Sequence, residues 1–151
     1  MATMETVINP FKEQIDVIKY DNFNGDFDDY REIIQARILT FVRLYENGDG
    51  VYLDDDGLYA DNRYFWMHVN YPQPLVNMGV FVGTDEEGDT IPPRTTLTQF
   101  VKDVVFIGSA YQLALYTRVN SELIDTSQGY EDYRNLFFNK DEEGNYYASQ
   151  Q

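Results

Sequence analysis

The segment of residues 63–71 constrains the fold more than any other part of the sequence, because its side chains alternate with the period of an extended strand. Neighbouring side chains of a strand point to opposite faces of the sheet. One face would hold Phe65, Met67, Val69 and Tyr71, and the other would hold Tyr64, Trp66 and His68. Pro72 and Pro74 follow and end the segment, so the sequence predicts a sheet that contains this strand.

A second segment, residues 26–47, has the period of a helix. Asp26 is a suitable N-cap, and Asp28 and Asp29 would lie in the first turn, where negative charge meets the positive end of the helix dipole. The pair Asn47-Gly48 would end the helix. Apolar residues recur at intervals of three or four and would form one stripe: Tyr30, Ile34, Ile38, Phe41 and Tyr45.

Between residues 48 and 91 the pattern changes to short strands and turns. Asp56-Gly57 is a strong hairpin signal, residues 80–82 are a further strand, and residues 129–138 fit a short helix. We therefore expect an α+β fold, in which one long N-terminal amphipathic helix packs on a mostly antiparallel sheet of about five strands, followed by a short C-terminal helix. The expected organisation is an N-terminal arm (1–25), a single α+β domain (26–140) and a polar C-terminal tail (141–151).

Residues 100–119 fit two structures. We favour a long strand through Val119, because its aromatic and β-branched residues are common in sheets. The alternative is a helix with Ser109 as its N-cap. That helix would place four residues on one face: Tyr111, Leu115, Val119 and Leu123.

Composition limits the possible functions. The chain has 26 Asp and Glu against 11 Lys and Arg, a formal net charge of −15, and no cysteine. This charge disfavours binding to nucleic-acid phosphates and to anionic membranes, and no apolar run reaches the ~18 residues that span a membrane. Residues 1–9 lack the features of a secretory signal. Disulfides, thiolate metal sites and cysteine nucleophiles are excluded.

No motif for catalysis or for a cofactor stands out. The acidic stretch from Glu46 to Asp61 is of a kind that attracts hard cations, but neither Gly50 nor Gly57 gives an EF-hand register, so solvated turns are favoured. His68, the only histidine, has no neighbouring metal ligand or nucleophile motif, and we expect a hydrogen-bonded histidine of the sheet. We expect no enzyme activity, no cofactor and no metal.

Aromatic residues are abundant, with 13 Tyr, 10 Phe and one Trp. Several occur in turns and near the ends of the chain, and Tyr and Trp are favoured at interfaces because they give much contact area for little lost rotamer freedom. We therefore predict protein partners, in a homo-oligomer or a larger assembly. The candidate interface residues are Phe11, Tyr20, Phe23, Tyr52, Tyr59, Tyr64, Trp66, Tyr146 and Tyr147.

The order of these segments resembles that of small virion structural proteins of tailed bacteriophages, such as neck, head–tail connector and tail-completion subunits. The resemblance rests on the arm Met1–Gly25, the amphipathic helix Asp26–Asn47, the aromatic strands with Asp-Gly turns, and a cysteine-free composition rich in Asn, Asp and Tyr. It implies a non-enzymatic, ring-forming assembly subunit. It also implies a location in the virion, or in the host cytoplasm before assembly.

The charge fits a second function, that of an acidic nucleic-acid mimic that inhibits a DNA-binding enzyme. Carboxylates on a rigid surface would occupy the basic groove that normally binds phosphates. This function predicts acidic groups on one face and binding that weakens steeply with salt, whereas an assembly subunit would keep its contacts at moderate salt. The candidate acidic surface comprises Asp54, Asp55, Asp56, Asp85, Glu86, Glu87 and Asp89.

Overall fold

The computed structural model describes residues 2–148, and within them the fold is α+β with antiparallel sheets. The strands are β1 (Thr3–Asn9), β2 (Gln14–Tyr20), β3 (Leu39–Arg43), β4 (Gly50–Asp54), β5 (Tyr64–His68), β6 (Leu75–Val76), β7 (Gly79–Thr84), β8 (Thr90–Ile91), β9 (Val104–Ser109), β10 (Asn139–Lys140) and β11 (Tyr146–Tyr147). The α-helices are α1 (Phe27–Ile34), α2 (Leu97–Lys102), α3 (Ala110–Val119) and α4 (Arg134–Phe137). Short 3-10 helices are η1 (Gly57–Tyr59) and η2 (Ser121–Leu123).

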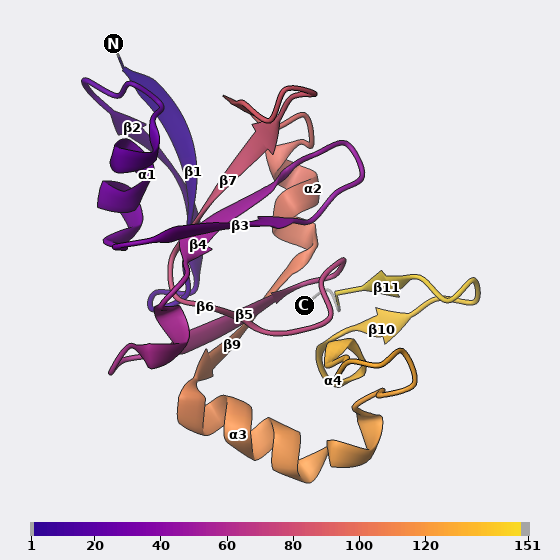
Figure 1. Ribbon diagram of the computed structural model, residues 1–151. Coiled ribbons are helices and arrows are strands. Elements are labelled where there is room, and N and C mark those ends of the chain that lie inside the picture. The colour runs from indigo at the N-terminus through magenta and orange to yellow at the C-terminus, as the bar shows by residue number, and fades with distance from the viewer. Residues whose placement is uncertain (1, 149–151) are drawn as a thin grey trace.

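β7 is the centre of a six-stranded sheet with the order β2-β1-β7-β4-β3, and β8 pairs with the end of β7. Neighbouring strands in this sheet run antiparallel. A three-stranded antiparallel sheet, β6-β5-β9, lies between the six-stranded sheet and α3 (Figure 1). β10 and β11 form a small hairpin near the C-terminal end.

Three apolar clusters hold these layers together. The cluster between the two sheets includes Trp66 and Phe81. A second cluster, with Tyr30 and Val80, lies between α1 and the other face of the six-stranded sheet, and a third, with Phe65, lies between the three-stranded sheet and the C-terminal segments. Adjacent residues such as Phe65 and Trp66 belong to different clusters, which confirms the predicted alternation within β5. The strand ends at His68, and Tyr71, predicted on the face of Phe65, packs against the cluster of Trp66 instead.

The long N-terminal helix expected over residues 26–47 is absent, and this part of the expected fold was wrong. α1 does have Asp26 as its N-cap, whose carboxylate accepts a hydrogen bond from the Asp29 backbone N–H at 3.0 Å. The helix ends after eight residues at Ile34, because Gln35 takes a left-handed conformation with φ +55°. Residues 39–43 then form β3.

Tertiary burial explains this difference. Residues 39–43 also alternate with the period of a strand, and their two faces pack into different clusters, Phe41 beside α1 and Val42 between the sheets. β4 pairs closely with this strand, since a Cβ on Gly50 would overlap the Val42 carbonyl oxygen. Glycine is therefore required at residue 50, and the hairpin buries two faces where a helix would bury one.

The long strand favoured for residues 100–119 was also wrong, and the alternative helix is confirmed. β9 ends at Ser109, whose hydroxyl accepts from the Gln112 backbone N–H at 3.3 Å, while Gln112 Oε1 accepts from the Ser109 N–H at 2.7 Å. This is a capping box. The β5–β9 register shifts between Phe65 and Trp66, and Gly108 has a φ of +120°, so a bulge turns the chain out of the strand.

The two ends of the described chain are hairpins. Within the expected arm, residues 3–20 form β1 and β2, and β1 lies inside the six-stranded sheet beside β7. Residues 139–147 contain the β10–β11 hairpin. The last part of the expected tail, residues 149–151, lies outside the described residues. The short helix expected within residues 129–138 is α4.

Candidate interaction surface

α3 has ten residues and no buried side chain. Three of its large apolar residues recur at intervals of four on one face, and Tyr111 is 73% exposed, Leu115 41% and Val119 65%. Leu123 of η2 is also exposed. A surface helix normally turns its apolar stripe toward the core, and exposed apolar patches mark contact sites. We call Tyr111, Leu115 and Val119 the α3 stripe.

Other side chains of α3 attach it to the domain. Ala110 and Leu113 pack against the cluster that contains Phe65. The ring of Tyr116 contacts Phe137 of α4 edge to face, with centroids 5.5 Å apart. The α3 stripe takes no part in these attachments.

The sequence around α3 carries little negative charge. No acidic residue occurs between Asp103 and Glu122, and the one charged side chain of α3 is Arg118. In a chain with a net charge of −15, another acidic molecule would meet less repulsion here than at the acidic turns.

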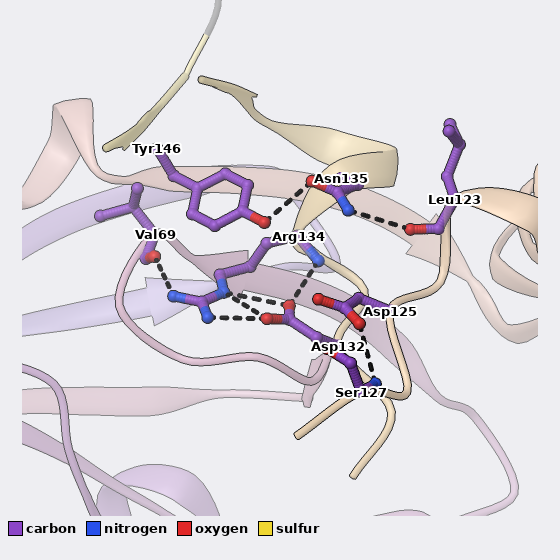
Figure 2. A network of polar contacts seen from close by, with 8 residues as sticks. All are labelled: Val69, Leu123, Asp125, Ser127, Asp132, Arg134, Asn135 and Tyr146. Carbon is purple, nitrogen blue, oxygen red and sulfur yellow. Dashed lines mark hydrogen bonds and ion pairs between the residues drawn. The ribbon is translucent and has the colours of Figure 1, made fainter. Parts of the chain in front are cut away.

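A largely buried ion pair fixes the segment that follows α3. Arg134 donates to both carboxylate oxygens of Asp132 at 2.7 to 3.2 Å and to the Val69 carbonyl, beyond the end of β5, at 3.3 Å (Figure 2). Burial by itself raises the pKa of the Asp132 carboxyl, but the hydrogen bonds and charge of Arg134 outweigh burial and hold that pKa below its usual value. This pair joins α4 to the three-stranded sheet.

The same network extends to β11 and η2. The Arg134 guanidinium lies 4.7 Å from the centroid of the Tyr146 ring. The Tyr146 hydroxyl donates to Asn135 at 2.8 Å, and the Asn135 amide donates to the Leu123 carbonyl at 3.1 Å (Figure 2). α3 is therefore held at its start by the Ser109 cap and beyond its end by this network.

His68 belongs to a separate, buried polar chain. The Asn70 backbone N–H donates to Nδ1 at 3.1 Å, so the neutral ring carries its proton on Nε2, which lies 2.8 Å from the Tyr45 hydroxyl. That hydroxyl donates to Asp103 at 2.6 Å. Burial lowers the pKa of His68 to about 3, whereas burial and then the hydrogen bond to Asp103 raise the pKa of Tyr45. The predicted hydrogen-bonded sheet histidine is confirmed, and its ring is shielded from solvent.

The candidate aromatic residues fall into three groups by exposure. Those buried in the core are Phe23, Tyr52 and Trp66. Those exposed are Phe11, Tyr59 and Tyr147. Those partly exposed are Tyr20, Tyr64 and Tyr146. Ring contacts join Phe11 to Tyr64 and Tyr20 to Phe23, and within residues 2–148 none joins either pair to Tyr59 or Tyr147.

The two acidic segments lie at opposite ends of the β4–β7 pair. Residues 54–56 lie at the end of β4, of which Asp54 is the last residue, and residues 85–89 form the turn between β7 and β8. Because Gly50 pairs with Val82, the two segments are separated by about seven residues along the strands, or about 24 Å. Asp56 also forms an ion pair with Arg37 at 3.1 Å. The structure thus does not bring the candidate acidic residues together.

One group of acidic side chains in residues 2–148 lies close enough to share a cation. The ligand atoms of Asp85, Glu87 and Asp89 are within 4.8 Å of one another. One oxygen of Asp85 already accepts hydrogen bonds from the backbone N–H groups of Glu87 and Asp89, both at 2.9 Å. These bonds explain the cluster as part of a tight turn.

The acidic stretch from Glu46 to Asp61 lies outside that group. Its Asp49 is fully buried and accepts hydrogen bonds from the backbone N–H groups of Arg94 at 3.1 Å and Thr95 at 2.6 Å. Asp49 therefore fastens the loop before α2 to the β3–β4 turn.

The α3 stripe was not among the candidate interface residues, although the sequence contains a signal for it. Ser109 and Gln112 have the spacing of a capping box, and this signal favours the helix in which Tyr111, Leu115 and Val119 share a face. A strand would also place Tyr111, Leu115 and Val119 on one face, but together with Leu113. The helix separates them, because Leu113 packs against the cluster that contains Phe65 and the α3 stripe stays exposed.

Comparisons with family models, with curated proteins and with solved structures each found no match to this chain. Among residues 2–148, no helix is both long and apolar enough to cross a membrane.

Proposed function

We propose that the protein is a non-catalytic assembly subunit that contacts a second copy of itself through α3. The observation that carries this proposal is the exposed α3 stripe of Tyr111, Leu115 and Val119. Full burial of one such side chain is worth roughly 1.5–3 kcal/mol, and Tyr is frequent among the residues that dominate interface energies. An uncharged stripe can pair with the same stripe of a second copy across a two-fold axis. We therefore favour a second copy as the partner, because the dimer needs no other binding surface on either chain.

The biological setting that we propose is the neck or tail of a tailed-phage virion. It rests on the sequence resemblance, of which the aromatic strands and the cysteine-free composition remain. The hairpin expected at Asp56-Gly57 is absent, because Gly57 begins the 3-10 helix η1. The helix Asp26–Asn47, another part of the resemblance, is replaced by α1 and β3. Burial of His68 supports a role without histidine catalysis.

The test is the solution mass, measured by light scattering on a size-exclusion column at about 50 mM and about 500 mM salt, where screening differs severalfold. We expect at least twice the 17.7 kDa of one chain. Association should increase with salt, because two copies of charge −15 repel each other less when screened. The variant Y111S/L115S/V119S should be monomeric.

The matched control is L97S/V101S, which removes two exposed apolar side chains from α2 and should keep the wild-type mass. A wild type that is monomeric at both salt concentrations overturns the proposal. So does a triple variant that keeps the wild-type mass.

The acidic mimic is the second candidate, and the net charge of −15 favours it. It predicts a complex with a basic DNA-binding enzyme that dissociates as salt rises, the opposite of the salt dependence expected for self-association. The separation of residues 54–56 from residues 85–89 makes it the weaker candidate.

A further inference from the structure

A groove of about 780 Å³ runs along a second face of α3. Its α3 wall follows helical spacing through Ala110, Leu113, Ala114, Thr117 and Arg118, and Ser121 of η2 continues it. These residues differ from those of the α3 stripe. The groove therefore extends along the whole helix, whose ten residues span about 15 Å.

The lining of the groove is mostly apolar. Phe65 of β5 and Leu58 of η1 line it opposite α3, together with Pro74. Ala110 and Ala114 are too small to fill the space between α3 and these residues, so the helix leaves a groove there. A ligand that fits this space needs an apolar group near its centre.

Two arginines line the same groove, near the two ends of α3. The carbonyl of Arg63 accepts a hydrogen bond from the backbone N–H of Ala110, the first residue of α3, at 3.1 Å. Arg118 lies in the last turn of α3. The other charged lining residue, Glu131, accepts a hydrogen bond from the Tyr133 hydroxyl at 2.8 Å. The charged side chains of the lining thus sum to one positive charge in a strongly acidic chain.

These two arginines differ from the other arginines in their contacts. Ion pairs with carboxylates engage Arg31, Arg37 and Arg134, and backbone carbonyls engage Arg43 and Arg94. By contrast, the Arg63 side chain donates one long hydrogen bond of 3.5 Å to the Leu58 carbonyl, and the Arg118 side chain makes no hydrogen bond or ion pair with residues 2–148. A guanidinium offers five N–H donors in a planar fork that fits a carboxylate, so both retain capacity for an anionic ligand.

We propose that this groove binds an extended acidic peptide segment of a partner protein. Five extended residues span about 13 Å between their first and last Cα atoms, close to the length of α3. Residues 1, 3 and 5 of such a segment point to the same side. Carboxylates at positions 1 and 5 would reach Arg63 and Arg118, and an apolar side chain at position 3 would contact Phe65 and Leu113. This binding does not depend on self-association, which uses the α3 stripe.

The probe is the peptide acetyl-Glu-Ala-Leu-Ala-Glu-amide, added to the ¹⁵N-labelled full chain while backbone amide shifts are recorded by NMR. Shifts should concentrate on α3 and on Arg63 to Phe65, with a Kd of about 1 mM, since short peptides bury little area. Two matched peptides test separately whether binding requires the carboxylates and whether it requires their spacing. The Gln-Ala-Leu-Ala-Gln peptide should bind at least about tenfold more weakly, and Ala-Glu-Leu-Glu-Ala should lie between the two.

The variant R63Q/R118Q should bind the Glu peptide at least about tenfold more weakly, and dispersed amide shifts will show that it is folded. The matched control is K12Q/K19Q, which removes the same charge from the β1–β2 hairpin, outside the groove. It should change the Kd by less than about twofold at moderate salt.

Four outcomes overturn the proposal. They are an absence of shifts at about 10 mM peptide, equal binding of the Gln peptide, equal loss in K12Q/K19Q, and equal shifts from sodium acetate at the same concentration of carboxylate. The last outcome would mean that the groove holds an isolated anion. None of these results depends on the mass of the Y111S/L115S/V119S variant, so failure here and failure of self-association are distinguishable.

Discussion

The Nε2 atom of His68 lies 2.8 Å from the hydroxyl of Tyr45, and through this contact a neutral imidazole joins three parts of the core. His68 is on β5, Tyr45 follows β3, and the Tyr45 hydroxyl donates to Asp103 at the end of α2. The His68 ring also stacks on Phe100 of α2, with centroids 5.7 Å apart. A proton on Nδ1 would break the hydrogen bond from Asn70, so this arrangement requires an uncharged histidine.

The first prediction is a loss of stability at acidic pH. The pKa of His68 is about 3 in the folded chain and about 6.5 in the unfolded chain. The unfolded state therefore takes up this proton first, and the free energy of unfolding should fall as pH decreases from about 6.5 toward 3, by up to about 1.4 kcal/mol per pH unit from this residue.

Urea unfolding between about pH 4 and pH 7 measures this slope. The variant H68Q has no titrating group at this position and should show a shallower slope than the wild type. The difference between the two slopes isolates the contribution of His68, because the wild type and H68Q share the same 26 acidic residues. Equal slopes would contradict the prediction.

The second prediction concerns the ion pair of Asp132 and Arg134. R134A would leave the buried Asp132 carboxylate without its partner, and we expect a loss of about 2–4 kcal/mol in the free energy of unfolding. The control is R31A, which removes an exposed pair with Asp28 and should cost less than about 1 kcal/mol. Urea unfolding at neutral pH compares them, and similar losses in the two variants would refute the prediction.

The third prediction concerns the turn from β9 into α3. A Cβ on Gly108 would overlap the Gln112 side-chain oxygen, and Gly108 has a φ of +120°. G108A should therefore disrupt the capping box and cost about 2–3 kcal/mol. The control G88A also has a positive φ, +84°, but nothing lies within 4 Å of its added Cβ, so it should cost about 1 kcal/mol. Thermal and urea unfolding give both values, and equal losses would show that Gln112 moves aside.

The fourth prediction concerns the buried carboxylate of Asp49. D49A would leave the backbone N–H groups of Arg94 and Thr95 without their acceptor, at a cost of about 2–4 kcal/mol. Hydrogen exchange should show faster exchange of the Thr95 amide in D49A than in the wild type. The exposed D55A variant is the control and should leave that amide unchanged. Unchanged protection in D49A would rule out this anchoring role.

Local patterns in the sequence correctly predicted several elements. The Asp26 cap, the alternation within residues 64–68 and the short helix near residue 134 all depend on neighbours within a few residues. The order of helix-like and strand-like segments also predicted a mixed α+β fold with antiparallel pairing. These features follow from backbone geometry and side-chain preference, which act over one turn or one strand.

Longer elements depended on contacts between distant residues. The apolar residues of 26–47 fit a helical stripe, yet Phe41 and Val42 pack on opposite faces of β3. The cluster of α1 covers Phe41, and the cluster between the two sheets covers Val42. Burial on two faces outweighs helix propensity, which differs by less than about 1 kcal/mol per residue among ordinary residues.

The candidate sites also combine features that local sequence predicts with features that depend on contacts between distant residues. An acidic, aromatic-rich α+β chain and the capping signal at Ser109 can be inferred from the residues alone. Packing of distant segments places Trp66 in the core and the acidic segments apart, and it leaves α3 with one exposed apolar face and another that borders an arginine-lined groove. The physical reason is that periodicity shows which residues share a face, whereas exposure of that face depends on which distant segments pack against it.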